Sequence, residues 1–493
     1  MEPLEKLRQV RIEKLEKIRK LGIDPYPASW NEADRREMVS TARKRALGKE
    51  DAVVAGRLMG WREHGKIIFA DLVDESGEIQ IVFKEDKLLP IAYCLLPLLD
   101  IGDFVGVAGN LFKTDAGELS IEVKDLTLLS KSLRPLPSQR YGLKDVEERY
   151  RRRYLDLIMN PEVKGRFEKI SQIVAAMREY LINEGYIEVL TPSLQPLYGG
   201  TLARPFETFF NALDTKMYLR ISNEMYLKRL IAGGFEKVFE FSVDFRNEGL
   251  DRFHNPEFLQ METMWAYADY EDNMALAEKM FAYIAEKVLG TTKVEYQGQK
   301  IDLAPPWQRM TMVDAVKEYG GIDFSKIKSR DEAVEIARKM KVKVSEDMGV
   351  GGILEEVFDT VAEKHLIQPT LIYNYHIETS PLSKPVPDNP DFTERFEVFI
   401  TGREFGNSYS EANDPLLLRR NFEAQQEMRK KGSLEAHPID EDFLEAMEYG
   451  MPPTSGIGVG MERLFMLLTN ANSIREVMFF PALRPEKGRD RNT

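Results

Sequence analysis

The stretch FRNEGLDRFHNPEF, residues 245–258, concentrates side chains that bind anions and orient substrates. It holds five formal charges and a histidine within fourteen positions, with a phenylalanine at each end. Arginine forks bind carboxylates and phosphates, and an aromatic ring can stack on a planar ligand. This stretch is therefore either a polar surface turn or one wall of a ligand site.

The segments on both sides alternate between apolar and polar residues, as β-strands do. In VFEFSVDFR, residues 238–246, Phe239 lies on the apolar face and Arg246 on the other. In FLQMETMWAY, residues 258–267, the second face carries Phe258, Glu262 and Met264. We expect an antiparallel pair with one face in the core. The other face is either a ligand floor or a water-facing surface.

A second candidate segment is GIGVGMERLFMLLTN, residues 456–470, a glycine run that leads into an apolar helix with one arginine, Arg463. A GxGxG pattern alone is weak, because tight packing also selects glycine. No βαβ unit follows within the remaining residues, so a dinucleotide-binding turn fits poorly.

The length of 493 residues predicts two or three domains, and 43% hydrophobic with 30% charged residues is typical of a soluble globular protein. We expect no transmembrane helix and, from the charged N-terminus, no signal peptide. Cys94 is the single cysteine, which excludes intramolecular disulfides and cysteine zinc sites and favours a cytoplasmic location. The five histidines lack i,i+4 pairs, which disfavours a histidine metal site.

The net charge of −13 argues against non-specific coating of nucleic acid, although local basic patches remain possible. The first twenty residues and RYRRR, residues 149–153, are two such patches. Each is either a binding surface or a solvated helix face.

The domain organisation follows from changes of pattern along the chain. Residues 1–50 are polar and helical, and residues 51–131 contain five strand-like runs with a helical segment after the third. This order matches an oligonucleotide-binding (OB) barrel, whose second and third strands carry Phe69 and Gln80. Alternatively, Phe69 belongs to the core of a generic small barrel. A linker is expected at 132–148 and one large domain at 149–493, with a helical insertion at about 305–370.

Taken together, these pieces resemble the lysyl-tRNA synthetase family of class II aminoacyl-tRNA synthetases. FRNEG and HNPEF resemble the second signature motif of the class, GIGVGMER the third, and EGYIEVLTPSL, residues 184–194, the first, which lies at a dimer interface. Lysine-specific segments are GGTLARPF (199–206), MYLRISNEMYLKRL (217–230), AYADY (266–270), GREFGNSYSEAND (402–414) and GDFVGVAGNLFKTDAGELS (102–120). The resemblance implies an α+β fold: an antiparallel sheet of six or seven strands flanked by helices, preceded by an all-β OB barrel.

The resemblance also implies a reaction and roles for individual residues. Lysine attacks the α-phosphate of ATP, and the lysyl group then passes to the 3′-hydroxyl of the terminal adenosine of tRNA(Lys). Arg246 and Arg463 are the implied catalytic residues, because guanidinium groups neutralise the charge that develops at phosphorus. The implied ATP-binding set is Arg246, Glu248, Arg252, His254, Phe258, Glu404, Gly460 and Arg463, and the implied Mg²⁺ ligands are Glu397 and Glu404.

The implied lysine pocket depends on carboxylates that match an ammonium group. Glu262 and Glu411 would face the side-chain ammonium, whereas an aspartate pocket would need a cation there. The full set is Gly200, Glu224, Arg246, Glu262, Met264, Asn407, Tyr409 and Glu411. On the barrel, Arg57, Phe69 and Gln80 match positions that contact the anticodon.

Two positions depart from the family pattern. Family members usually carry a tyrosine where this chain has Met264. We expect the loss of its hydrogen bond to the lysine side-chain ammonium, worth about 1–2 kcal/mol if no other group replaces it. Many bacterial members have arginine directly before the histidine, whereas this chain has Phe253 there and Arg252 one position earlier. We expect the loop still to deliver Arg252 to the phosphates.

Three alternatives stay open at this point. The first is a synthetase for aspartate or asparagine, and the second is a lysyl transferase with a non-tRNA acceptor. The third is a catalytically inactive tRNA-binding module. The expected partners are tRNA(Lys), L-lysine, ATP and a second copy of the chain, with no membrane.

Overall fold

The computed structural model describes residues 3–45, 47, 51–137, 142–327, 329–346, 348–430 and 438–485. The chain divides into two compact units, Met1–Lys144 and Asp145–Thr493. Each unit has its own hydrophobic core, and the two are described separately below.

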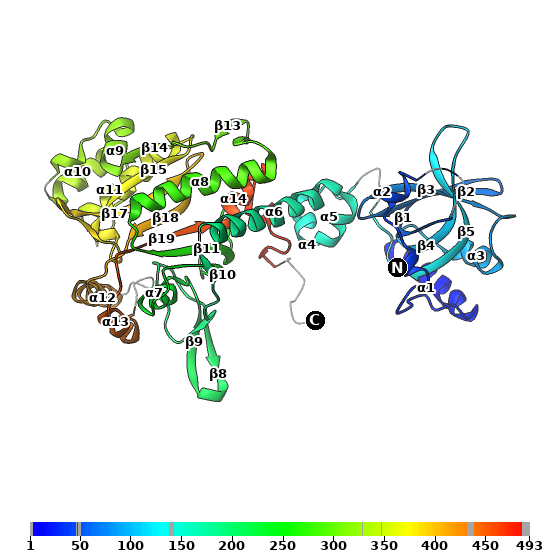
Figure 1. The fold of residues 1–493 in the computed structure, drawn as a ribbon, viewed down its shortest axis with the longest axis horizontal. Coiled ribbons are helices and arrows are strands. Elements are labelled where there is room, and N and C mark those ends of the chain that lie inside the picture. The colour runs from blue at the N-terminus through cyan, green and yellow to red at the C-terminus, as the bar shows by residue number, and fades with distance from the viewer. Residues whose placement is uncertain are drawn as a thin grey trace. The chain divides into compact units, whose positions relative to one another are not determined.

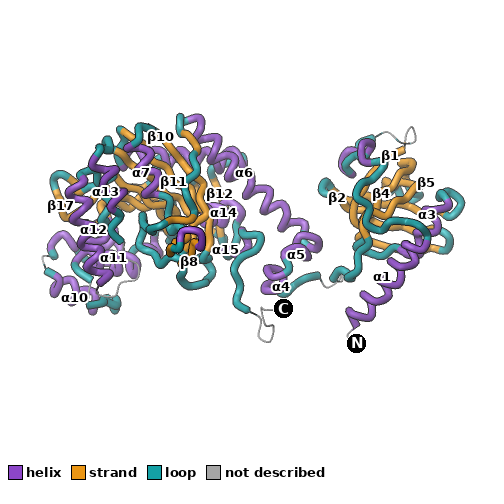
Figure 2. Tube along the Cα trace, turned by 90° about the horizontal axis from the view of Figure 1, so that it is seen from below, coloured by secondary structure: helices purple, strands orange, loops and turns teal. Residues whose placement is uncertain are grey.

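The first unit contains a closed five-stranded barrel with strand order β1-β2-β3-β5-β4 (Figure 2). Its strands are β1 (Asp51–His64), β2 (Ile67–Asp74), β3 (Gly77–Lys84), β4 (Phe104–Lys113) and β5 (Leu119–Ser130). Helix α3 (Pro90–Leu95) lies between β3 and β4, as the sequence predicted. The pairing of β3 with β5 is parallel and closes the barrel. The expected OB barrel is therefore confirmed.

The N-terminal helix α1 (Pro3–Lys20) packs on the barrel. Ile18 is fully buried in the barrel core, together with Val39 of the short helix α2 (Val39–Ala42). Arg11 of α1 donates to the carbonyl oxygens of Ser132 and Ile101 at 3.2 and 2.9 Å. Helix and barrel thus share one core.

The second unit is built on a mixed sheet with strand order β14-β15-β17-β18-β19-β11-β10-β6 and a ninth strand, β16, beside β17. The strands are β6 (Ile187–Glu188), β10 (Lys237–Phe245), β11 (Glu257–Ala266), β14 (Gln308–Thr311), β15 (Thr370–His376), β16 (Pro385–Val386), β17 (Asn389–Phe399), β18 (Glu404–Ser410) and β19 (Thr454–Gly460). The prediction of six or seven strands was too low for the described residues, because β6, β14 and β16 are too short to show a period. The central strands are antiparallel as expected, whereas β14–β15 and β10–β6 pair in parallel.

Three groups of helices cover the sheet (Figure 1). The first group packs with the main core: α6 (Pro161–Asn183), α8 (Tyr270–Leu289) and α14 (Met461–Thr469). The second surrounds the end of β10 and β11: α7 (Glu224–Ala232), α12 (Pro415–Lys430) and α13 (Glu441–Glu448). The third packs on β15 and β17: α9 (Met312–Gly320), α10 (Arg330–Lys339) and α11 (Val350–Val361). This third group occupies the segment expected to be a helical insertion, which also contributes β14 to the sheet.

The remaining elements lie at the margins of the second unit. They are α4 (Val146–Arg151), α5 (Arg153–Met159), α15 (Ile474–Val477), the hairpin β12 (Lys293–Tyr296) and β13 (Gln299–Asp302), and a small sheet of β7 (Leu194–Gln195), β8 (Glu207–Phe210) and β9 (Thr215–Leu219). The β8–β9 hairpin projects from the body of the unit (Figure 1).

A buried arginine holds the segment after α14 against α5. Arg153 is 1% exposed and donates to Asp156 at 2.6 Å. It also donates to the carbonyl oxygens of Arg475, Met478 and Phe479 at 2.7, 3.2 and 3.2 Å. A single guanidinium group therefore satisfies the backbone acceptors of a segment distant in sequence.

Replacing Arg153 with methionine is expected to destabilise the second unit by about 3 kcal/mol, because three backbone acceptors and a buried carboxylate lose a charged donor. The measurement is the urea midpoint of its unfolding transition by circular dichroism. Arg152→Met is the matched control, since Arg152, at the adjacent position, forms a partly exposed i,i+4 pair with Glu148 at 2.9 Å. Equal midpoints for the two variants would contradict the prediction.

Candidate active site

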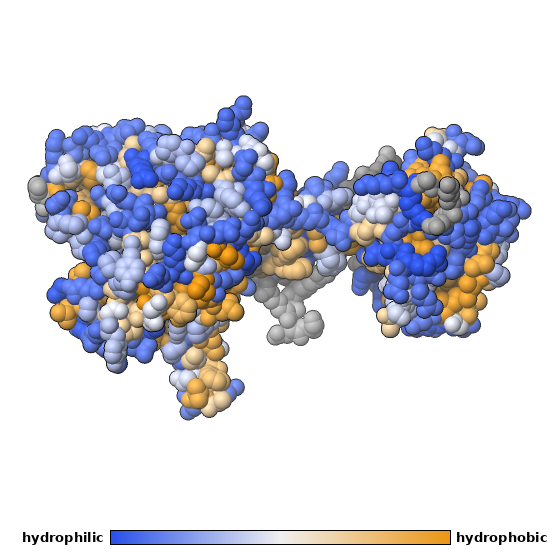
Figure 3. Space-filling view, viewed as in Figure 1, coloured by the Kyte–Doolittle hydropathy of each residue, from blue (hydrophilic) through white to orange (hydrophobic). Residues whose placement is uncertain are grey.

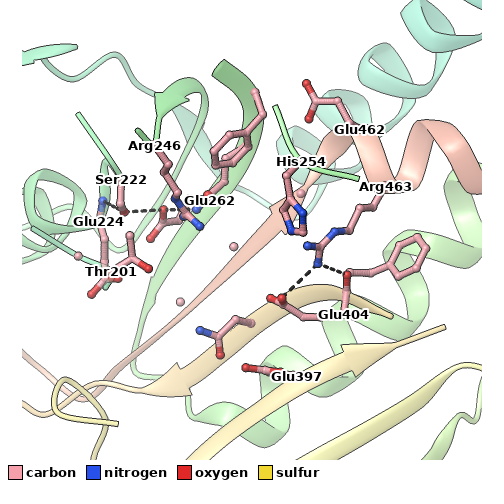
Figure 4. Close-up of a pocket in the computed structure, with 18 of the residues that line it drawn as sticks. Thr201, Ser222, Glu224, Arg246, His254, Glu262, Glu397, Glu404, Glu462 and Arg463 are labelled. Atoms are coloured by element: carbon pink, nitrogen blue, oxygen red, sulfur yellow. Dashed lines mark hydrogen bonds and ion pairs between the residues drawn. The ribbon is translucent and has the colours of Figure 1, made fainter. Parts of the chain in front are cut away.

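One pocket brings together the residues that the sequence analysis selected in the second unit (Figure 4). It lies over β11, β17, β18 and β19, beside the N-termini of α7 and α14. The predicted residues that line it are Gly200, Glu224, Arg246, Glu248, His254, Phe258, Glu262, Met264, Glu397, Glu404, Asn407, Tyr409, Glu411, Gly460 and Arg463. Arg252 is not among the lining residues.

One strand of the pair expected from the alternating pattern, β11, forms part of the pocket floor, and Arg246 directly after β10 also lines the pocket. β10 and β11 are antiparallel, with Glu240 opposite Glu262 and Asp244 opposite Phe258. Met261 points to the main core, and Glu262 points into the pocket. The second face is thus a pocket floor, and the water-facing alternative is excluded. β11 ends at Ala266, one residue earlier than expected.

Glycines in β19 allow this strand to pack closely against β11 beside the pocket. A Cβ atom on Gly456 would lie 2.6 Å from Sδ of Met264 and 2.7 Å from the carbonyl oxygen of Thr263. At Gly458 it would lie 3.0 Å from Nε2 of Gln260. The glycine run therefore serves close packing beside the pocket, and β19 continues directly into α14.

One end of the pocket is strongly acidic. Glu262 is 4% exposed and accepts hydrogen bonds from Gln260 at 2.9 Å and Ser222 at 3.4 Å. Burial, with Glu224 and Asp244 nearby, raises the pKa of Glu262 well above its ordinary value. Figure 4 shows Glu224, Ser222 and Glu262 facing the same space. A buried carboxylate with few partners is a site for a cationic ligand.

The structure adds a residue that the sequence analysis missed, Lys228. Its ammonium group is 1% exposed, lies 2.6 Å from Oε2 of Glu411 and also pairs with Glu224. Burial raises the pKa of Glu411 to about 8, although Lys228 acts in the opposite direction. The i,i+4 spacing of Glu224 and Lys228 was the available signal, but the same spacing is common on exposed helix faces.

A second part of the pocket, beside the acidic end, is lined by Arg246 and Phe258. The Arg246 guanidinium lies 4.9 Å from the centroid of the Phe258 ring, and its Nε donates to the carbonyl oxygen of Ile221 at 3.4 Å. Burial raises the pKa of Asp244, behind Arg246, to about 6, while Arg220 and Arg246 lower it. An anion clamp and an aromatic platform thus share one face of the sheet.

Two carboxylates and two arginines form the third part of the pocket. Arg463 donates to the backbone carbonyl and, at 3.2 Å, to the side chain of Glu404. Arg395 donates to Glu397 at 2.6 Å. Burial and the nearby Glu404 raise the pKa of Glu397 to about 8, with Arg395 opposing them. A divalent cation would relieve this repulsion, so the pair suits a hard metal ion. Within the described ranges, no group of three or more metal-ligating side chains is present.

The middle of the loop 246–256 differs from expectation. Arg252 donates to both the backbone and the side chain of Asn472, and its carbonyl accepts from Ile474. Phe253 lines the pocket instead, with the Arg403 guanidinium 3.4 Å from its ring centroid. The structure therefore does not bring Arg252 to the predicted phosphate site, because the segment after α14 holds it.

His254 does reach the pocket, and its Nδ1 lies 2.7 Å from Oδ2 of Asp251. Other lining residues that were not selected from the sequence are Thr201, Ser222, Gln260, Arg395 and Glu462. Gln260 alternates with Phe258 and Glu262, so the strand pattern alone could have identified it. Arg395 and Glu397 share a strand face in the same way.

The three residues selected on the barrel lie on or beside β1, β2 and β3. Phe69 alternates with the buried Ala70 and Leu72 and lies outside the barrel core, which excludes the core alternative. Gln80 donates to Ser120 at 2.8 Å. Asp71 lies opposite Gln80 in the β2–β3 pair and, like Phe69, is outside the barrel core.

Arg57 is half-buried and donates to the carbonyl oxygen of Gly102 at 2.9 Å. Its guanidinium lies 4.1 Å from the centroid of Phe104. Arg62, opposite Phe69, was not predicted and forms two hydrogen bonds with Asp71 at 2.5 and 2.7 Å. The outer face of these strands therefore offers an aromatic ring beside polar and cationic groups.

The fold and the pocket together are those of a class II tRNA synthetase domain that follows an OB barrel in the sequence. A family model described as tRNA synthetases class II (D, K and N) matches residues 145–484, and a model described as OB-fold nucleic acid binding domain matches residues 52–129.

Curated relatives named lysine–tRNA ligase match nearly the whole chain. The protein of Moorella thermoacetica is 50% identical over 481 residues, which is 98% of both chains. That of Thermoanaerobacter pseudethanolicus is 50% identical over 98% of this chain and 97% of its own. That of Bacillus subtilis is 49% identical over 97% of each. The chain belongs to the lysine–tRNA ligase family.

Within the part of the chain that the structure describes, no helix has the length and apolar character needed to cross a membrane.

The ligand-free protein is expected to lose stability, by about 1–3 kcal/mol, as Glu411 ionises between its ordinary pKa of 4.5 and its folded pKa of about 8. In that range the folded state binds a proton that the unfolded state has lost, so the free energy of unfolding falls as the pH rises. Glu411→Gln removes this ionisation. The melting temperature of the variant relative to wild type should rise from pH 5 to pH 8, and parallel curves would contradict the prediction.

Proposed function

We propose that this protein attaches L-lysine to tRNA(Lys) with ATP, through a lysyl-adenylate intermediate. The observation that carries the proposal is the pocket itself, in which Arg246 and Phe258 face three buried carboxylates, Glu224, Glu262 and Glu411. The membership of the chain in the lysine–tRNA ligase family supports the same conclusion.

In the first step, a carboxylate oxygen of lysine attacks the α-phosphorus of ATP, and pyrophosphate leaves. No protein nucleophile is needed, because the substrate carboxylate supplies the electron pair. Arg246 binds this carboxylate and the α-phosphate, and so neutralises the charge that accumulates at phosphorus. Phe258 stacks on adenine, and Arg463 binds the γ-phosphate. Glu248, His254 and the backbone at Gly460 complete the nucleotide site.

Lysine selection follows from the balance of charges. Bound lysine brings one carboxylate and two ammonium groups, and Arg246 neutralises the carboxylate. When all three are ionised, Glu224, Glu262 and Glu411 together oppose one protein ammonium, Lys228, so that the pocket then has two negative charges for the two substrate ammonium groups. Gly200 and Glu224 hold the α-amino group, while Glu262 and Glu411 face the side-chain ammonium. Met264, Asn407 and Tyr409 shape the wall between them.

The same balance disfavours the alternative substrates. An aspartate side chain would add a negative charge to an end that already carries three buried carboxylates. An asparagine side chain would leave their charge uncompensated. The presence of the OB barrel disfavours a non-tRNA acceptor.

Glu397 and Glu404 are the residues that would hold Mg²⁺ beside the phosphates. The ion supplies charge neutralisation at the phosphate oxygens when bound. Arg395 and Arg463 keep the two carboxylates oriented toward this place, through the hydrogen bonds described above.

In the second step, the 3′-hydroxyl of the tRNA attacks the activated carbonyl carbon, and AMP leaves. Arg57, Phe69 and Gln80 contact the anticodon, with Phe69 stacking on a base. The active form is a homodimer, supported by apolar side chains left exposed near the first motif, among them Leu190 at 89%. The projecting β8–β9 hairpin is also apolar at its tip, with Phe209 and Leu213 exposed (Figure 3). The site of action is the cytoplasm.

Lysine-dependent exchange of pyrophosphate into ATP tests the proposed reaction directly. Wild-type protein is expected to support exchange with L-lysine and not with L-aspartate or L-asparagine. Arg246→Ala should lower kcat/KM for this exchange about 10³-fold, because a charge-stabilising donor is lost. Binding of tRNA to the variant should be nearly unchanged. Exchange with aspartate alone, or full activity of the variant, would overturn the proposal.

Replacing Phe69 with alanine should act only on the tRNA-dependent step. Loss of one base stack is worth about 1–3 kcal/mol, so KM for tRNA(Lys) should rise about 10-fold or more. Pyrophosphate exchange needs no tRNA and provides the internal control, because it should proceed at the wild-type rate. An unchanged KM for tRNA would remove Phe69 from the anticodon site.

A further inference from the structure

Lys228 is the one cation that the described part of the chain places directly against the carboxylates of the lysine pocket. It lies on α7, one turn after Glu224, and reaches Glu411, which follows β18. Its ammonium is also 5.3 Å from the centroid of the Tyr409 ring. Lys228 itself does not line the pocket, but three residues that it contacts do.

The contacts join elements that are distant in sequence. Glu224 begins α7 at one side of the pocket, and Glu411 lies at the other side, where its backbone N–H donates to Thr454 at 2.8 Å. Lys228 contacts both carboxylates from outside the pocket lining. Without this bridge, Glu411 would face Glu224 in a buried space with no cation beside it, which favours the neutral form of Glu411.

A neutral carboxyl group is a poor partner for an ammonium ligand, because the ionic part of the interaction is lost. The ionisation state of Glu411 therefore affects how well the pocket binds a cationic substrate. The surrounding groups do not replace Lys228. Glu262 on β11 and Asp244 on β10 add negative charge, and Tyr409 on β18 is a neutral phenol whose pKa burial raises well above its ordinary value.

We propose that Lys228 is a positioning residue for the amino-acid substrate: it joins Glu224 to Glu411 and favours the ionised form of Glu411, so that the pocket accepts both ammonium groups when lysine binds. This inference rests on the proposed function and deepens it. Lys228 does not touch the substrate. It acts through the two carboxylates, and its fixed charge sets the number of ammonium groups that the pocket can neutralise.

The test is lysine-dependent pyrophosphate exchange by Lys228→Met, with kcat and KM measured separately from pH 6.5 to pH 8.5. At pH 7 we expect KM for lysine to rise at least about 10-fold, with kcat reduced less than about 3-fold. The KM defect relative to wild type should shrink as the pH rises, because Glu411 then ionises without its cation. KM for ATP should stay at the wild-type value.

Arg229→Met is the matched control, since it removes one cation from the next position of the same helix. Arg229 pairs with Asp440 and Asp442, both at 2.9 Å, and does not line the pocket. Its KM for lysine should match that of wild type at every pH. A purely structural role for Lys228 would instead give a loss independent of pH, or a fall in kcat at unchanged KM.

Two further results would overturn the inference. An unchanged KM in Lys228→Met would show that the bridge is not needed, and a lower KM would show that the carboxylates stay ionised without it. If the single variant does not fold, Lys228→Met combined with Glu411→Gln removes both members of the pair. The reference for this variant is Glu411→Gln alone, and the two should have a similar KM for lysine, because Lys228 acts through that carboxylate; a further rise of about 10-fold that does not change with pH would overturn the inference. A wild-type protein that shows no lysine-dependent exchange would refute the proposed function itself.

Discussion

The burial of charge at one end of a strand floor is the constraint on which the rest of the pocket depends. Glu262 on β11 is buried beside two hydrogen-bond donors, Ser222 and Gln260. Glu224 and Glu411 are buried beside the ammonium group of Lys228, which compensates part of their charge. The glycines of β19 follow from the same need, because a side chain at Gly456 would occupy the space beside Met264. The packing around the pocket and its charge are thus parts of one arrangement.

A second buried network fixes the position of Arg246. Arg220 is 5% exposed and donates to Glu240 at 2.8 Å and to the carbonyl oxygens of Val243 and Thr191 at 2.9 and 3.2 Å. Thr191 in turn donates to Glu240 at 2.7 Å. Thr191 belongs to the first motif, and Val243 lies on β10, which ends one residue before Arg246. The orientation of the anion clamp is therefore tied to the first motif and to the proposed dimer face beside it.

Periodicity was sufficient to predict the barrel and the antiparallel strand pair, because both depend on local patterns that repeat over several residues. Most of the pocket residues came instead from the resemblance to a known family. The short strands β6 and β14 and the partner of Arg252 depend on contacts between distant segments, which no local pattern contains, and β16 has only two residues. Lys228 shows the same limit. An acidic and a basic residue four positions apart are equally typical of an ion pair on an exposed helix face. The Glu224–Lys228 pair is buried because α7 packs against β11.

Arg395 links the amino-acid pocket to the proposed metal site. Its guanidinium donates to Glu397 at 2.6 Å and to Oδ1 of Asn407 at 3.0 Å, while Ser380 and the carbonyl oxygen of Thr379 accept at 2.9 and 3.1 Å. Because the fork is planar and every one of these acceptors is fixed, neither Asn407 nor Glu397 can turn without breaking a charged hydrogen bond. Lysine and the metal-bound phosphates would therefore meet on a preorganised surface, and the reaction would require little rearrangement of these side chains once both substrates are bound.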